Sequence, residues 1–162
     1  MTSVKEGEIM TFKSVDEILE YAIDREKEAV AFYTDLSTKD TFASVKETFV
    51  RFAKEEEKHV ELLQGISADT AKVESYKLAK VPDLKISDYL VETEYKEGMF
   101  MQDILRIAMK KEEMAVKLYQ DLSEKADNAN FCKLFDLLAQ EESKHKLALE
   151  TMYDDFLADN EN

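Results

Sequence analysis

The sequence predicts an all-α protein in which four long helices form one bundle. Three glycines and one proline among 162 residues are too few for the many turns of an all-β fold, while abundant Glu, Lys, Ala, Leu and Met favour helices. The second observation is an internal repeat. Residues 18–39 align without gaps on residues 104–125 with 11 identities in 22, and residues 49–63 on residues 135–149 with 7 in 15. Two copies of one helical hairpin are therefore expected.

The first helix is expected to begin at Ser14, because Ser14 and Glu17 have the spacing of a capping box. Residues at spacings of three and four then form a stripe on one face of this helix. A turn is predicted after it, at residues 37–41. The stripe is Leu19, Ala22, Glu26, Ala29, Tyr33 and Leu36.

The other three helices have the same period. The second is expected to start near residues 40–42 and to end near Gly65. The third and fourth repeat the first two, with a turn at residues 126–130. The stripes of these three helices are, in order, Phe49, Phe52, Glu56, His59 and Leu63; Leu105, Ala108, Glu112, Ala115, Tyr119 and Leu122; and Phe135, Leu138, Glu142, His145, Leu149 and Met152.

We expect a single domain over residues 1–162, with hairpins at residues 14–66 and 99–158. Residues 67–98 connect them, and a segment of this length suits a crossover that runs the length of a bundle. A short helix is predicted at residues 86–91 of the crossover. Its tyrosines are expected to pack against the outside of the bundle. The crossover contains Tyr76, Pro82, Tyr89 and Tyr95.

One set of polar residues occurs in both repeats, and every member of the second set lies 86 positions after its counterpart. Both histidines of the chain belong to it, each in a Glu-x-x-His motif. In each hairpin, the midpoint between the first glutamate and the second falls in the predicted turn, at residue 41 or 127, so the two glutamates should face each other at mid-bundle. The residues are Glu26, Glu56 and His59, matched by Glu112, Glu142 and His145.

Four buried glutamates need partners, because an isolated buried carboxylate is costly. No basic residue occupies the predicted inward stripes. Two divalent cations would neutralise the four charges, with two imidazoles completing the ligand set. A glutamate followed by Glu-x-x-His, present twice, is the set found in di-iron and di-manganese bundles. We therefore expect two metal ions per chain; carboxylate and imidazole ligands without thiolate suit iron or manganese, and zinc could occupy the same site. The alternative is a structural polar core without metal.

Charge and cysteine content exclude several classes of protein. A formal charge of −14 opposes nucleic-acid binding and favours cations. No apolar run has membrane-spanning length, and no signal peptide is recognisable, so a cytoplasmic protein is expected. Cys132 is the only cysteine, which excludes an intrachain disulfide and a cysteine-ligated iron site. It is interpreted as a small residue near a helix start.

The motifs around these ligands resemble the rubrerythrin-type branch of the ferritin-like di-iron carboxylate proteins. The resemblance covers both hairpins. It rests on Glu26 with Tyr33 seven residues later, Glu-Glu-Lys-His at residues 56–59, Glu112 with Tyr119, and Glu-Ser-Lys-His at residues 142–145.

The resemblance implies a ferritin-like bundle and a role for each ligand. Glu56 and Glu142 would bridge two irons, Glu26 and Glu112 would be terminal ligands, and His59 and His145 would each cap one iron. Two tyrosines lie two turns from their glutamates on the inward face. Their hydroxyls are expected either to hydrogen-bond the carboxylates or to belong to ordinary core aromatics. These tyrosines are Tyr33 and Tyr119.

The chain departs from the rubrerythrin pattern in two places. It has no cysteine-rich rubredoxin-like iron site, so electrons would come from an external donor such as a rubredoxin-like protein. Rubrerythrin also has a further glutamate one turn after the first ligand of the third helix, where this chain has Ala115. Ala29 is its counterpart in the first helix. These small residues either leave room for a small oxidant or allow close helix packing.

Three functional classes remain after this comparison. The leading one is a di-iron oxidoreductase that reduces hydrogen peroxide or dioxygen. The second is a ferroxidase or iron-handling protein, and the third is a non-catalytic bundle stabilised by metal. A homodimer is compatible with the sequence, which does not fix the oligomeric state.

Overall fold

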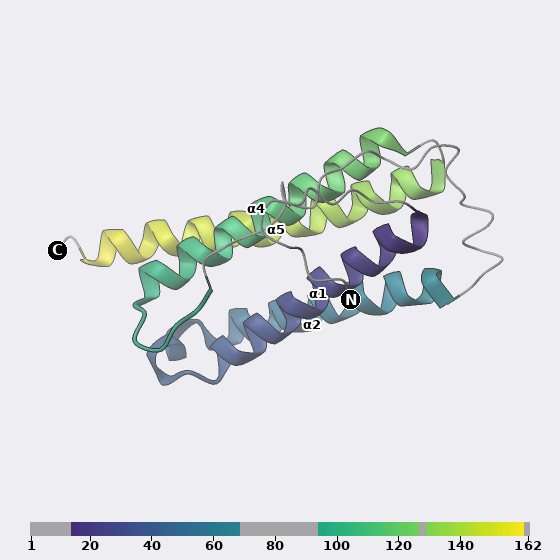
Figure 1. Ribbon diagram of the computed structural model, residues 1–162. Coiled ribbons are helices and arrows are strands. Elements are labelled where there is room, and N and C mark those ends of the chain that lie inside the picture. Colours follow the sequence, from purple (N-terminus) through teal and green to yellow (C-terminus); the bar gives the residue numbers. More distant parts are fainter. Residues whose placement is uncertain (1–13, 69–93, 127–128, 161–162) are drawn as a thin grey trace, which may run out of the picture.

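The computed structural model describes residues 14–68, 94–126 and 129–160, and every regular element in these ranges is helical. Within these ranges, four long helices pair as two hairpins, and Figure 1 shows the pairing. The first hairpin joins α1 (Val15–Ser37) to α2 (Lys46–Ala68), and the second joins α4 (Met101–Lys125) to α5 (Ala129–Asn160). The prediction of an all-α bundle made of two repeated hairpins is confirmed.

Helix α1 begins where the sequence predicts. Ser14 has extended backbone angles, and its hydroxyl accepts a hydrogen bond of 3.1 Å from the amide of Glu17. The bond satisfies one of the amides that a helix leaves without a partner in its first turn. The helix ends at Ser37, where the amide of Thr38 donates to the carbonyl of Asp35.

The turn after α1 differs from the prediction. A 3-10 helix, η1 (Asp40–Val45), precedes α2, so the second long helix starts at Lys46 and not near residues 40–42. Phe42 leaves helical geometry, with φ of −110° and ψ of 22°. Its side chain is fully buried and meets the ring of Phe49 edge-on, with 6.5 Å between ring centroids. We attribute the tighter turn to this burial. Helix α2 also continues past Gly65, to Ala68.

Most of the predicted crossover, residues 69–93, lies outside the described residues, and so do the expected helix at 86–91 and Tyr76, Pro82 and Tyr89. Tyr95 is described, and it packs on Phe42 with 6.1 Å between ring centroids, beneath the ammonium of Lys39. The chain then turns into α4 through Gly98, whose φ of +90° favours a residue without a side chain.

The buried apolar core falls into two clusters. We call them the Tyr119 cluster and the Tyr33 cluster. Residues that correspond in the repeat fall in opposite clusters, so an approximate two-fold axis relates the hairpins. None of the described helices is long and apolar enough to cross a membrane. The Tyr119 cluster is Ile18, Leu19, Ala22, Ile23, Val60, Leu63, Ile66, Leu118, Tyr119, Leu122, Phe131, Phe135, Leu138 and Ala139. The Tyr33 cluster is Tyr33, Leu36, Phe42, Phe49, Phe52, Ala53, Ile104, Leu105, Ile107, Ala108 and Leu149.

Candidate metal centre

All six residues predicted as ligands come together between the two core clusters. Four helices contribute to the group, and every member is at most 7% exposed. Helical spacing explains the convergence, since a glutamate and a histidine three residues apart share one face of a helix. The members are Glu26 from α1, Glu56 and His59 from α2, Glu112 from α4, and Glu142 and His145 from α5.

The six residues form two overlapping groups of four. In each group, one ligand atom from every residue lies within 4.8 Å of the others. Glu56 and Glu142 belong to both groups, so they stand where carboxylates shared by two ions would stand. Both groups draw residues from both hairpins. The first group is Glu26, Glu56, His59 and Glu142, and the second is Glu56, Glu112, Glu142 and His145.

The contacts inside the second group are close but are not aligned as hydrogen bonds. His145 Nδ1 lies 2.7 Å from Glu56 Oε1, yet neither atom has a hydrogen-bond partner. The two atoms are close enough for a hydrogen bond but do not form one, and a contact that is not aligned is weak. Glu112 Oε1 and Glu142 Oε2 are also near this nitrogen, at 3.5 and 3.6 Å. Atoms that converge in this way without hydrogen-bonding each other could serve together as ligands of one metal ion.

The first group is equally close, but it contains one hydrogen bond, between His59 Nδ1 and Glu142 Oε1. His59 Nδ1 lies 3.0 Å from Glu142 Oε1, 3.4 Å from Glu26 Oε2 and 3.7 Å from Glu56 Oε2. Of these three oxygens, Glu26 Oε2 has no hydrogen-bond partner, and Glu112 Oε2 in the second group has none either. Leaving such buried atoms unsatisfied costs free energy. Hard cations with carboxylate and imidazole ligands would satisfy them, so the residues present fit a metal centre.

Without a cation, the cluster would have to hold protons. Burial and the charge of Glu26 raise the pKa of Glu56 from 4.5 to about 7. Burial also raises the pKa of Glu26 and, more strongly, that of Glu112. For His59, burial lowers the pKa, but the carboxylates that surround it outweigh burial and raise it from 6.5 to about 12. Divalent ions would replace these protons.

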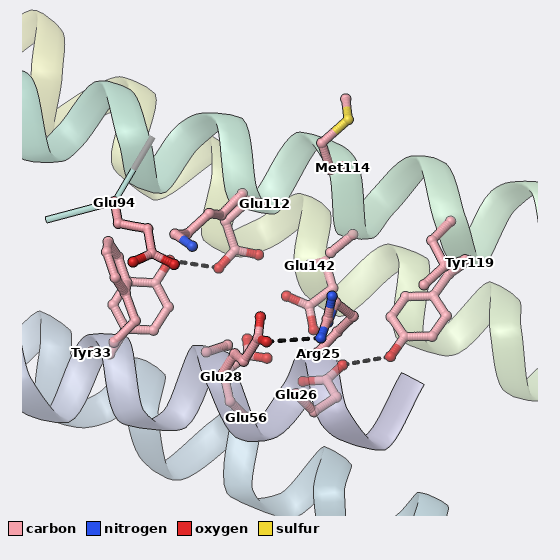
Figure 2. A pocket seen from close by; sticks show the side chains of 15 residues that line it. Arg25, Glu26, Glu28, Tyr33, Glu56, Glu94, Glu112, Met114, Tyr119 and Glu142 are labelled. Carbon is pink, nitrogen blue, oxygen red and sulfur yellow. Dashed lines mark hydrogen bonds and ion pairs between the residues drawn. The ribbon is translucent and has the colours of Figure 1, made fainter. Parts of the chain in front are cut away.

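Two tyrosines hydrogen-bond the cluster across the hairpins. The hydroxyl of Tyr33, on α1, donates to Glu112 Oε1 on α4, and the hydroxyl of Tyr119, on α4, donates to Glu26 Oε1 on α1, each at 2.6 Å (Figure 2). Burial and the nearby carboxylates raise the pKa of both phenols well above 10, so both hydroxyls stay protonated. Of the two sequence-based alternatives, the hydrogen-bonding one holds, although each partner lies in the opposite hairpin.

Sequence analysis missed one residue at the site. The carboxylate of Glu55 lies 2.5 Å from His145, between Oε2 and Nε2, on the side of the ring that faces away from the cluster. A signal was present, because an acidic residue precedes the ligand glutamate in both repeats, as Glu55 and as Glu141. The pattern alone does not show which of the two reaches a histidine.

A cavity of about 220 Å³ adjoins the cluster, and most of its lining comes from α1 and α4. Ala29 and Ala115 line it, so these small residues leave open space and do not bring the helices into close contact there. Glu28 and Glu94 also border the cavity, as Figure 2 shows. A small molecule could therefore reach the carboxylates between α1 and α4.

A helical bundle with a buried cluster of four glutamates and two histidines defines the class of ferritin-like di-iron carboxylate proteins. Within that class, residues 17–101 and 103–162 match the family model for rubrerythrin. The chain belongs to the rubrerythrin family. The family and the cluster together indicate a metal-binding protein, and iron is the metal that they indicate. No curated protein sequence matches this chain.

Solved structures have the same fold. A hypothetical protein from Pyrococcus furiosus is 29% identical, with a TM-score of 0.66 over 90% of this chain and 91% of its own. A proposed ferritin-like diiron-carboxylate protein from Thermotoga maritima is 23% identical, with a TM-score of 0.69 over 90% and 97%. An uncharacterised conserved protein from Magnetospirillum magnetotacticum is 21% identical, with a TM-score of 0.65 over 88% and 95%.

Proposed function

We propose that this protein is an oxidoreductase that reduces hydrogen peroxide or dioxygen at a site holding two iron ions. One observation carries the proposal, namely that two groups of four ligands overlap and share Glu56 and Glu142. We assign these two glutamates as bridges, Glu26 and Glu112 as terminal ligands, and the two histidines as caps of one iron each. Manganese or zinc could substitute for iron.

Bound as a ferrous pair, the metal would supply two electrons, which with two protons convert peroxide to two waters, or dioxygen to peroxide. The residues of the chain hold the ligands and admit the oxidant. Tyr33 and Tyr119 fix the orientation of Glu112 and Glu26 through their 2.6 Å hydrogen bonds. Ala29 and Ala115 leave the approach to the carboxylates open.

Each cycle needs an external electron donor. Cys132 is the only cysteine in the sequence, so this chain cannot form a cysteine-ligated iron site of its own. We propose a rubredoxin-like protein or a small reductant as the donor. It would restore both irons to the ferrous state, one electron at a time.

Ferroxidase activity is the second candidate. Among the described residues that line the cavity, six glutamates outnumber two basic residues, Arg25 and Lys111, although Arg25 pairs with Glu28 at 2.7 Å. The chain carries a formal charge of −14, and the six glutamates are Glu26, Glu28, Glu56, Glu94, Glu112 and Glu142. This negative charge would attract ferrous ions and would not repel a neutral oxidant, so it suits a ferroxidase. A ferroxidase would oxidise many added ferrous ions per chain, whereas the leading proposal requires the oxidant and donor to turn over while the two irons stay bound.

Anaerobic reconstitution with Fe(II), followed by stopped-flow mixing with peroxide and with dioxygen, tests the proposal. We expect about two irons per chain, a Mössbauer spectrum of a coupled ferric pair after oxidation, and repeated turnover when a donor is present. Glu56→Ala should abolish the ferric pair, because Glu56 belongs to both groups of four. Glu57→Ala is the matched control and should keep it, because Glu57 is the next glutamate along α2 and is exposed. One iron per chain, or no coupled ferric pair, would contradict the proposal.

A further inference from the structure

His145 is held on the side that faces away from the cluster. Its Nε2 lies 2.5 Å from Glu55 Oε2, while its Nδ1 faces the carboxylates of the second group. A ring that donates Nε2–H to a carboxylate keeps the Nδ1 lone pair for a metal. A carboxylate in this position also makes the imidazole a stronger ligand.

Two further residues lie around His145 and Glu55. The ring of Phe52 stacks on the imidazole, with 4.2 Å between centroids and 25° between planes. Arg51 Nε lies 4.0 Å from Glu55 Oε1, one turn along α2, and its guanidinium lies over the ring of Phe52, 5.6 Å from the ring centroid. The imidazole is therefore oriented by one hydrogen bond and by one ring face.

His59 has different surroundings, although the repeat gives it matching positions. Leu137 stands where the other hairpin has Arg51, and Leu138 stands where it has Phe52. Glu141, the counterpart of Glu55, has its carboxylate 3.2 Å from Lys144 Nζ on its own helix. Within the described part of the chain, every contact of the His59 ring nitrogens with a carboxylate is made by Nδ1.

We propose that Glu55 is a positioning residue that makes the two metal positions unequal. The position at His145 is the tighter one and fills first, and the position at His59 fills second. The inference rests on the proposed dinuclear site and adds an order of loading to it. A histidine already held in its binding orientation loses less freedom when it coordinates, so its position gains affinity.

Anaerobic titration with Co(II), followed by visible absorption, measures each binding step without any turnover. We expect two resolved steps for the unmodified protein. His145→Ala should remove the tighter step and His59→Ala the weaker one, which assigns each step to a position. Glu55→Ala should weaken the tighter step by about 10- to 100-fold and leave the other unchanged.

Glu141→Ala is the matched control and should change neither step, because this glutamate pairs with Lys144. Glu55→Gln keeps an acceptor for Nε2–H without the charge, so it should restore part of the lost affinity. Circular dichroism would confirm that the variants fold, as expected for a half-exposed residue.

Two equal steps in the unmodified protein, or equal effects of Glu55→Ala and Glu141→Ala, would overturn the role of Glu55 and leave the dinuclear site standing. Binding of a single Co(II) would overturn both. The two failures are therefore distinguishable in one titration series.

Discussion

The two hairpins supply the same ligands at the same spacing but surround their histidines differently. Glu55 and Phe52 hold His145, whereas Glu141 turns to a lysine and leaves His59 to the carboxylates of the cluster. The ligand positions of the repeat have stayed alike, while positions next to them have diverged. A duplicated site can thus have two different halves without any change of ligand.

The largest effect is expected at the two glutamates that belong to both groups of four, compared with the histidines, which belong to one group each. Glu56→Ala or Glu142→Ala should lower bound iron from about two per chain to well below one, because both residues belong to both groups of four. His59→Ala or His145→Ala should leave about one iron. Metal analysis after anaerobic reconstitution measures this. If the glutamate and histidine variants lost metal to the same extent, the assignment of bridges would be wrong.

The next effect concerns the two core clusters, in which residues that correspond in the repeat take equivalent places. Leu36 and Leu122 correspond in the repeat, and both are fully buried in opposite clusters. Each leucine-to-alanine change should reduce the free energy of unfolding by about 2–5 kcal/mol. Urea denaturation of the metal-free protein measures the reduction. Leu147→Ala is the control, since this side chain is 65% exposed.

If both variants lose the same free energy of unfolding, the hairpins differ around their histidines and not in the core. A loss at one position that is less than half of the other would show that the asymmetry extends into the core. The Leu147→Ala variant should stay within about 0.5 kcal/mol of the unmodified protein.

The pH dependence of the metal-free protein tests the charge of the cluster as a whole. Glu56 has a pKa of about 7 against 4.5 ordinarily, and His59 a pKa of about 12 against 6.5. In both cases the folded state binds more protons than the unfolded state, so stability should fall as pH rises from about 5 to about 9. Thermal melts across this range measure the decline.

Metal-loaded protein provides the control for the pH series. Metal ions replace the protons of the cluster, so the decline should be absent after loading, and the melting temperature should rise with metal concentration. A melting temperature of metal-free protein that rose over the same range, with no protection by Fe(II) or Mn(II), would show that these carboxylates do not form a mutually repelling cluster.

The smallest effect is expected at the two tyrosines. Tyr33→Phe and Tyr119→Phe each remove one buried hydrogen bond to a carboxylate, which should cost about 1–3 kcal/mol of stability. The two losses should be equal, because the bonds are related by the repeat and have the same length. Denaturation of metal-loaded protein measures them. A neutral result at one tyrosine would indicate that its hydrogen bond does not form in solution.

The ligand cluster was predictable because helical period and the repeat determine it together. Six residues at fixed spacing must share a face, and the turns at both midpoints bring those faces to one level. The start of α2 was predicted wrongly, because the buried ring of Phe42 tightens the turn into η1. Glu55 was missed because its contact depends on which rotamer it adopts against another hairpin. Spacing within a helix carries no information on that choice.

Neither hairpin holds a complete group of four ligands, so the packing of the hairpins against each other and the binding of metal are linked equilibria. Reciprocity follows from this linkage. A molecule that enters between α1 and α4 and separates them would weaken metal binding by some factor, and bound metal would weaken that molecule's binding by the same factor. The affinity of such a molecule for the cavity beside Ala29 and Ala115 would therefore depend on whether metal is bound.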